Sequence, residues 1–335
     1  MSRNISMKDI LFGIGAGRAQ SVGNMEVIPL ISEDRDEIID ESMYGTPADV
    51  EIGTRNYGEV DMRNVSDRVN FVPPGAGWVV KEAAQDHAIG SGEILGPKAL
   101  NLVKTARCIQ SNQGGTISKA AHEMLVLPVE LRGIALAKRN MRGYSEMWDD
   151  LANFNSQHGI RGFRELAIFL KEFKRQMDQF VAEFELVPNQ IGAVIIINGK
   201  VIGIEIAPTR DYWQYVWTPL IRVCYGSLAS ECYKRSSVDH RNIPISNRDP
   251  LELVENTLSG LRDAVLKTDQ DRIDAVNVFV SSLKKKKFLV GNVEQNRSNH
   301  YLLSGLIRPD RENGQIEGQI VVTEKTIPFF SACGV

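Results

Sequence analysis

The first third of the chain consists of short apolar segments separated by clusters of turn-forming residues. Turn signals recur at Gly45-Thr46-Pro47, Asn56-Tyr57-Gly58 and Pro73-Pro74-Gly75. The segments between the turns are rich in Val and Ile, and the predicted strands are MEVIPLIS, ADVEIG, VNFV, GWVV, ALNLV and ARCIQ. Because closely spaced short strands are typical of sandwiches, residues 25–127 predict a β-sandwich or a strongly bent sheet. Residues 1–24 are expected to form an N-terminal arm.

Residues 128–186 change to a helical pattern and are interpreted as a helical insertion. From Arg161 onward, apolar residues recur at spacings of three and four, which predicts one long amphipathic helix. Those apolar positions are Phe163, Leu166, Leu170, Phe173, Met177, Phe180 and Phe184. The same positions follow a heptad, so two packings are open: a seam inside the chain, or a coiled coil between two copies.

Residues 187–283 begin with the strongest hairpin signal of the chain. In GAVIIINGKVIGIEIA, Asn198-Gly199 separates two runs of Ile and Val, and this dipeptide suits a type I′ turn. A helix is predicted from Asp211 to Arg235, with Pro219 as a kink or a first turn. Residues 239–250 are expected to be a loop, and LELVENTLSGLRDAVL a further helix.

Residues 284–335 return to strand patterns. The predicted strands are KKFLVGNVE, HYLLSGLIR, GQIEGQIVV and IPFFSACGV. Strands at both ends of a chain with helices between them favour one α+β domain whose sheet is completed by the C-terminus. We therefore predict that residues 25–335 form a single α+β domain, a bent β-sandwich-like sheet with packed helices.

Composition and charge indicate where the protein is located in the cell, but they do not indicate its function. The net charge of −3 gives no general attraction to nucleic acid or to anionic membranes. Lys284 to Lys287 form a local basic run, interpreted as a solvated edge with an anion or nucleic-acid contact as the less favoured alternative. No segment approaches the roughly 20 apolar residues of a membrane span, and no signal peptide is recognised. The four cysteines lack C-x-x-C spacing, so we expect a cytoplasmic protein, of a host or of a virus growing in one.

Titratable and amide side chains crowd between Lys81 and Gly115, and any functional site is expected there. His87 is the candidate acid–base residue because the pKa of histidine lies near neutrality. If the segment is a strand, Gln85 and His87 share one face. A hydrogen-bonded histidine at a strand end is the alternative interpretation.

A second polar group follows one strand later and is expected to meet the first. Arg107, Gln110 and Gln113 are candidate ligand-binding residues together with Gln85, since they offer donors and acceptors for an anionic or nucleotide-like molecule. Cys108 is a candidate nucleophile if its strand neighbours that of His87, although most cysteines in such strands are small buried hydrophobes.

Metal and cofactor sites are not predicted. The five histidines have no i, i+4 partner and no neighbouring cysteine cluster. The early GIGAGR, Gly13 to Arg18, lacks the following helix that a dinucleotide site needs, so a flexible turn is expected there.

The chain resembles the ARG-and-rhodanese-phosphatase-associated protein domain family. The resemblance is carried, in order, by EVIPLI (Glu26 to Ile31), by AQDHA around Gln85 and His87, by RCIQSNQGG, and by GAVIIINGKVIGIEIA followed by DYWQYVWTPLIRVCYGSLASE. His87 stands where the family pattern has Arg, and Gln110 where it has Glu.

The resemblance implies a link to NAD or ADP-ribose metabolism. We therefore expect a ligand-binding or enzymatic protein that acts on an NAD-like, ADP-ribose-like or other nucleotide-like molecule. Gln85, His87, Arg107 and Gln110 would line the site, with Arg107 facing the ligand's negative charge. The alternative is a non-catalytic interaction or assembly protein, such as a homo-oligomeric viral structural subunit, because long heptad-spaced helices and crowded aromatics also serve subunit contacts.

Overall fold

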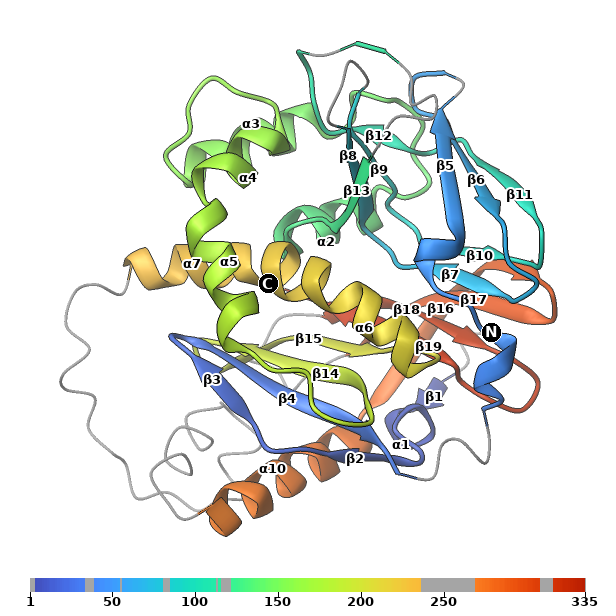
Figure 1. Cartoon of the computed structure of the whole chain (residues 1–335), viewed down its shortest axis with the longest axis vertical. Coiled ribbons are helices and arrows are strands. Elements are labelled where there is room, and N and C mark those ends of the chain that lie inside the picture. Colours follow the sequence, from blue (N-terminus) through green and yellow to red (C-terminus); the bar gives the residue numbers. More distant parts are fainter. Residues whose placement is uncertain are drawn as a thin grey trace.

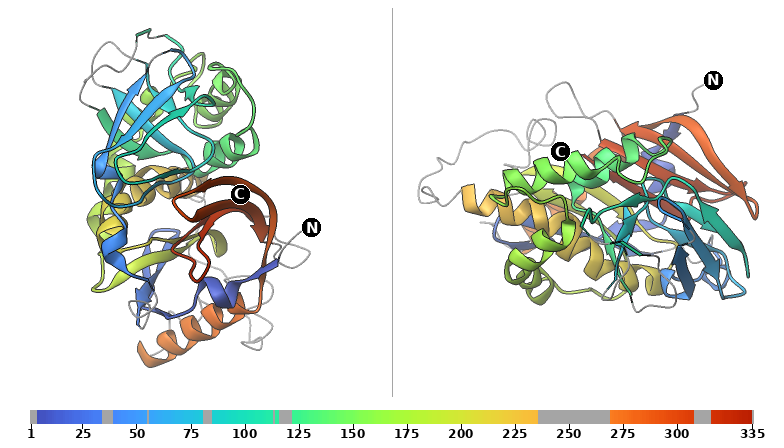
Figure 2. Two further views of the ribbon diagram at one scale, coloured as in Figure 1. Left: turned by 90° about the vertical axis from the view of Figure 1, so that its right-hand side faces the viewer. Right: turned by 90° about the horizontal axis from the view of Figure 1, so that it is seen from above.

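The structure is a computed structural model that describes residues 4–33, 39–54, 56–80, 85–112, 114–115, 122–235, 269–307 and 316–334. In these residues a ten-stranded antiparallel sheet forms the base of the molecule (Figure 1). Its strand order is β1 (Asn4–Ser6), β16 (Lys287–Arg297), β17 (His300–Ile307), β18 (Ile316–Val322), β19 (Phe329–Cys333), β15 (Lys200–Ile206), β14 (Gln190–Ile197), β4 (Met25–Ser32) and β2 (Ile14–Ala16), with β3 (Gln20–Val22) also paired to β4. The sheet curls strongly, as Figure 2 shows from the side.

The N-terminal residues are part of this sheet and do not form a separate arm. β1 pairs with β16, and both β2 and β3 pair with β4. The short helix α1 (Met7–Ile10) buries Met7 and Ile10 beneath the sheet. β1, β2 and β3 each have only three residues, which is too short for a period-two pattern to be recognised in the sequence.

The predicted hairpin at Asn198-Gly199 is confirmed. Both residues have positive φ, 50° and 74°, as a type I′ turn requires. The preceding strand β14 is buried along its whole length, which explains its unbroken run of apolar residues. On one face it packs under α6 (Arg210–Thr218), and on the other it lies over α10 (Asp269–Lys284) and α1.

The helix predicted over Asp211 to Arg235 is also confirmed. It runs as α6, a π-helical segment Pro219–Tyr225 and α7 (Gly226–Arg235). Pro219 lacks an N–H and so disturbs the regular ladder at that point. The predicted loop 239–250 and the helix LELVENTLSGLRDAVL lie outside the described residues. Among the helices that are described, none is long and apolar enough to cross a membrane.

A second, β-rich part stands above the large sheet (Figure 1). It contains the sheet β11 (Leu100–Val103), β6 (Val60–Asn64), β5 (Val50–Thr54), and the sheet β12 (Arg107–Cys108), β9 (His87–Ala88), β8 (Ala76–Val80), β13 (His122–Val126). β10 (Glu93–Leu95) pairs with β7 (Asn70–Val72) beside them. Val60, Met62, Trp78 and Leu95 belong to the apolar core of this part. These strands carry the predicted sandwich-like character, and the chain is an α+β protein.

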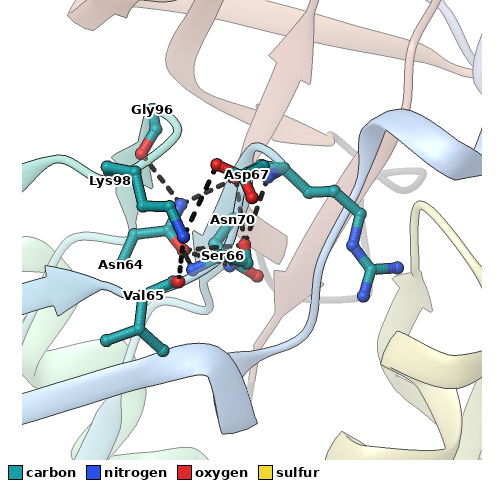
Figure 3. A network of polar contacts seen from close by, with 8 residues as sticks. Asn64, Val65, Ser66, Asp67, Asn70, Gly96 and Lys98 are labelled. Atoms are coloured by element: carbon teal, nitrogen blue, oxygen red, sulfur yellow. Dashed lines mark hydrogen bonds and ion pairs between the residues drawn. The ribbon is translucent and has the colours of Figure 1, made fainter.

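A buried asparagine fastens one turn of the β-rich part (Figure 3). The Asn64 amide donates to the carbonyl oxygens of Arg68 at 2.7 Å and of Gly96 at 2.8 Å. Its oxygen accepts from the Ser66 backbone N–H at 3.0 Å and from the Asn70 amide at 2.9 Å. One side chain therefore holds the β6–β7 turn against the segment that leads into β11.

The helical insertion is present, but its long helix is broken. The insertion contains α2 (Val129–Ala137), α3 (Trp148–Gln157), α4 (Leu166–Glu172) and α5 (Lys174–Glu183). The predicted single helix is wrong because Phe173 leaves the helical conformation, with φ −102° and ψ 8°. Phe169 packs with α3 in one apolar cluster, whereas Phe180 packs against the helices over the large sheet. The heptad seam is therefore divided between two internal cores.

A buried ion pair joins the β-rich and helical parts to the large sheet. Arg132 of α2 donates to Glu205 of β15 at 2.5 Å and to the Pro74 carbonyl oxygen at 2.9 Å. The guanidinium also donates to the Ser331 hydroxyl, and the Tyr225 hydroxyl donates to Glu205 at 2.6 Å. Because Arg132 and Glu205 are both buried, each charge depends on the other for compensation.

Candidate functional site

The strands of His87 and Cys108 are neighbours, as the sequence analysis required. In the antiparallel register of β9 and β12, His87 lies directly opposite Cys108, and on the other side of β9 it lies opposite Trp78. The Ile109 N–H donates to the Asp86 carbonyl oxygen at 2.9 Å and continues this pairing. Side chains at paired positions emerge on the same face of a sheet.

One face of this strand pair is polar. Gln85 and Gln110 lie just outside the two strands and contact this pair through their backbone. The Gln85 carbonyl oxygen accepts from His87 Nδ1 at 2.8 Å, and the Gln110 carbonyl oxygen accepts from the Cys108 thiol at 2.8 Å. Gln110 also forms an isolated antiparallel bridge with Glu165, directly before α4. These five residues, Gln85, His87, Cys108, Gln110 and Glu165, are called the polar face below. The structure thus brings together three residues of the predicted site, Gln85, His87 and Gln110.

His87 is held in one tautomer. Its Nδ1 lies 2.8 Å from the Gln85 carbonyl oxygen, which can only accept, so Nδ1 carries the proton and Nε2 presents a lone pair. Burial lowers the pKa of His87 below its usual value, and this favours the neutral imidazole near pH 7. A neutral imidazole with a bare Nε2 is the form of histidine that acts as a general base.

Three buried polar atoms of the polar face lack a hydrogen-bond partner within the described part of the chain: His87 Nε2, Gln85 Oε1 and Glu165 Oε2. The three side chains are at most 5% exposed. Each unpaired buried group costs about 1–3 kcal/mol, so such a concentration is unusual in a core. All three atoms are hydrogen-bond acceptors: an imidazole nitrogen without a proton, an amide oxygen and a carboxyl oxygen.

The carboxyl groups beside His87 differ in environment. Asp86 accepts a hydrogen bond from the Val80 N–H at 2.8 Å, and burial raises its pKa to about 6. Its own N–H donates to the Gln110 side-chain oxygen at 3.3 Å. Glu165 accepts from the Ser111 hydroxyl at 2.9 Å. The amide of Gln110 therefore positions Asp86, and Ser111 positions Glu165.

Cys108 is a buried thiol. Its sulfur donates to the Gln110 carbonyl oxygen at 2.8 Å, and burial raises the pKa of the thiol. A raised pKa keeps the sulfur protonated at neutral pH, whereas nucleophilic cysteines need the thiolate. The geometry gives Cys108 a packing role on the polar face.

Arg107 lies on the opposite face of β12, because it is paired with Ala88 and adjacent to Cys108 in sequence. Its guanidinium donates to the carbonyl oxygens of Thr105 at 2.9 Å, of Met141 at 3.2 Å and of Lys138. Lys138 ends α2, so the positive charge sits at the negative end of that helix. Arg107 is turned away from the polar face and holds the C-terminal end of α2.

The remaining predictions have different outcomes. Gln113 lies outside the described residues. The flexible turn predicted for GIGAGR is wrong for Ile14–Ala16, because these residues form β2 and pair with β4. Among the residues described, no group of three or more His, Cys, Asp or Glu side chains is placed to hold a metal ion.

Sequence reasoning missed Glu165. It lies far beyond His87 in the sequence and reaches the polar face through its bridge to Gln110 and the hydrogen bond from Ser111. The one local signal is its place as N-cap of α4, directly before an apolar helix. That position normally favours Ser, Thr, Asp or Asn, so a Glu that is also 4% exposed is unusual.

The fold and the polar face define an α+β protein with a buried, acceptor-rich polar cluster. The model of the ARG and Rhodanese-Phosphatase-superfamily-associated Protein domain matches residues 13–290. The match covers most of the chain, which therefore belongs to this family. No curated protein and no solved structure matches the chain significantly.

Proposed function

We propose that the polar face is a ligand-binding site at which His87 performs acid–base chemistry on a small, hydroxyl-bearing molecule. The observation that carries the proposal is the bare, buried Nε2 of His87, fixed by the bond from Nδ1 to the Gln85 carbonyl oxygen. In this role Nε2 takes a proton from a hydroxyl group or a water held against the face. A ligand would also donate hydrogen bonds to the three buried acceptor atoms, whose burial without a partner costs free energy.

The ligand class follows from the acceptors of the face. Gln85 Oε1, His87 Nε2 and Glu165 Oε2 suit hydrogen-bond donors such as the hydroxyl groups of a ribose. Phosphate oxygens need donors instead, and the two terminal nitrogens of the Arg107 guanidinium already donate to three carbonyl oxygens. We therefore propose that the face holds the ribose portion of an NAD-like or ADP-ribose-like molecule, in keeping with the family resemblance.

We propose that the protein is located in the cytoplasm. Cys108, Cys224 and Cys333 are buried free thiols, a state typical of reducing compartments. Most of the heptad-spaced and aromatic residues that suggested an assembly protein are buried within the fold. Examples are Phe173, Phe180, Trp213 and Trp217. Ligand binding is therefore the better-supported proposal.

The test is a calorimetric titration of ADP-ribose, NAD and ribose 5-phosphate into three proteins: the wild type, His87→Gln and His122→Gln. His122 is exposed on β13, at the other edge of the same sheet, and is the matched control. We expect binding to the wild type and to His122→Gln, with affinity at least about tenfold weaker in His87→Gln, equivalent to ~1.4 kcal/mol. Equal affinities in all three proteins, or no binding by any, would overturn the proposal.

A further inference from the structure

Two exposed tyrosines form a stacked pair at the end of the molecule where β12 lies. Tyr57 comes from the β5–β6 turn and Tyr144 from the segment between α2 and α3, and their ring centroids are 5.4 Å apart at an interplanar angle of 29°. Trp148, the first residue of α3, packs edge-on against Tyr144. Tyr57 is 50% exposed and Tyr144 is 39% exposed, so aromatic surface is left open to solvent. Figure 1 shows the β5–β6 turn, β12 and α3 at this same end.

Both tyrosines are tied to the polar face by hydrogen bonds. The Tyr57 hydroxyl accepts from the Gly115 N–H at 3.4 Å, and the Gly115 carbonyl oxygen accepts from the Gln85 N–H at 3.3 Å. The Tyr144 carbonyl oxygen accepts from the Cys108 N–H at 2.8 Å. The aromatic pair is therefore linked to the polar face at two points, the backbone N–H groups of Gln85 and Cys108.

Glycines keep the tyrosine pair closely packed against these segments. Gly58, with φ +80°, follows Tyr57, and a Cβ there would lie 3.3 Å from the Tyr144 Cβ. A Cβ on Gly114 would lie 3.3 Å from the Tyr57 hydroxyl oxygen. The backbone at Gly58 and Gly114 therefore lies so close to the two tyrosines that a side chain at either glycine would be crowded.

We infer that the Tyr57–Tyr144 pair is the stacking surface for a planar heteroaromatic ring, such as the adenine of a nucleotide-like ligand. The inference rests on the proposed function, since the ribose of the same ligand occupies the polar face. Rings of nucleobases stack on aromatic side chains whatever their substituents, whereas the acceptors of the polar face bind hydroxyl groups. A ligand that carries both a base and a ribose uses both surfaces, and a sugar alone uses only the polar face.

The experiment compares two probes, adenosine and ribose, on the wild type and on Tyr57→Leu, Tyr57→Phe and His87→Gln. Binding is measured by calorimetry, because it reports both probes without a label. In Tyr57→Leu we expect adenosine affinity to fall about tenfold while ribose affinity is unchanged. Tyr57→Phe keeps the ring and is expected to bind adenosine like the wild type. His87→Gln is expected to weaken both probes.

The outcomes separate this inference from the proposed function. If adenosine binds equally well to the wild type and to Tyr57→Leu while His87→Gln weakens it, the stacking surface is rejected and the polar face stands. If ribose also weakens in Tyr57→Leu, the residue acts through the fold of the site and the inference again fails. If neither probe binds the wild type, both the proposed function and the inference are overturned. Tyr57 is half exposed, so none of its variants is expected to unfold the chain.

Discussion

His87 and Cys108 lie directly opposite each other on β9 and β12. This register decides which side chains can act together, because neighbouring residues along a strand point to opposite faces. It gathers Gln85, Gln110 and, by its bridge, Glu165 beside His87. It also sends Arg107 to the other side. A shift of one residue would reverse both assignments.

Asp86 should make stability depend on pH. Its pKa is raised to about 6 in the folded chain from 3.8, so the folded state binds the proton more tightly than the unfolded state does. The resulting stability is fully present below about pH 4 and is lost as pH rises through about 6. A shift of about two pKa units corresponds to at most ~3 kcal/mol.

The variant Asp86→Asn removes this titration and can still accept from the Val80 N–H. The difference in unfolding free energy between Asp86→Asn and the wild type should therefore shift in favour of the variant between pH 4 and pH 7. Urea denaturation at several pH values measures it, and the other titrating groups cancel in the difference. A difference that stays constant with pH would contradict the burial of an ionisable Asp86.

Arg107 should be important for stability rather than for ligand affinity. Replacing it with Met leaves the carbonyl oxygens of Lys138 and Met141 without their donor and removes a positive charge from the end of α2. We expect a loss of about 2–4 kcal/mol in the free energy of unfolding. The affinity for ADP-ribose, measured well below the melting temperature, should stay within about twofold of the wild type. A large loss of affinity in a stably folded Arg107→Met would instead support the ligand contact expected from the sequence.

The Arg132–Glu205 pair should behave as a unit. Arg132→Met leaves the buried carboxylate of Glu205 uncompensated, and such a loss costs about 3–5 kcal/mol. The double variant Arg132→Met/Glu205→Leu removes both charges and should be more stable than the sum of the single changes predicts. Chemical denaturation of the four proteins gives this coupling energy. Simple additivity would mean that the two side chains do not compensate each other.

Local signals explain what could be predicted of the fold. The Asn198-Gly199 turn is specified by two adjacent residues with positive φ, and the strands around it by continuous apolar runs. The break at Phe173 was not predictable, because the apolar spacing is continuous across it. Residues up to Met177 pack in one core and Phe180 packs in another. The strands of residues 4–22 are fixed by their partners β4 and β16, which periodicity within the segment cannot reveal.

The same limit applies to the candidate site. Gln85 and His87 were recognisable because they are two residues apart, and the bond from His87 Nδ1 to the Gln85 carbonyl oxygen is correspondingly local. The placement of Arg107 depended on the register with β9 and on the position of α2, neither of which is local. The placement of Glu165 depended on its bridge to Gln110 and its hydrogen bond from Ser111, which are equally distant in sequence. Sequence patterns therefore predicted the strand that carries His87 better than the distant residues that surround it in the candidate site.

The proposed contact between His87 Nε2 and the ligand is tested most directly by an NMR measurement of the imidazole nitrogens. His87 is assigned by comparison with His87→Gln. We expect free His87 to be neutral and protonated on Nδ1 at pH 7. Adding ADP-ribose should shift its Nε2 resonance while that of the exposed His122 stays unchanged. A proton on Nε2 in the free protein, or a His87 signal that saturating ADP-ribose leaves unmoved, would contradict the claim that this nitrogen faces the ligand.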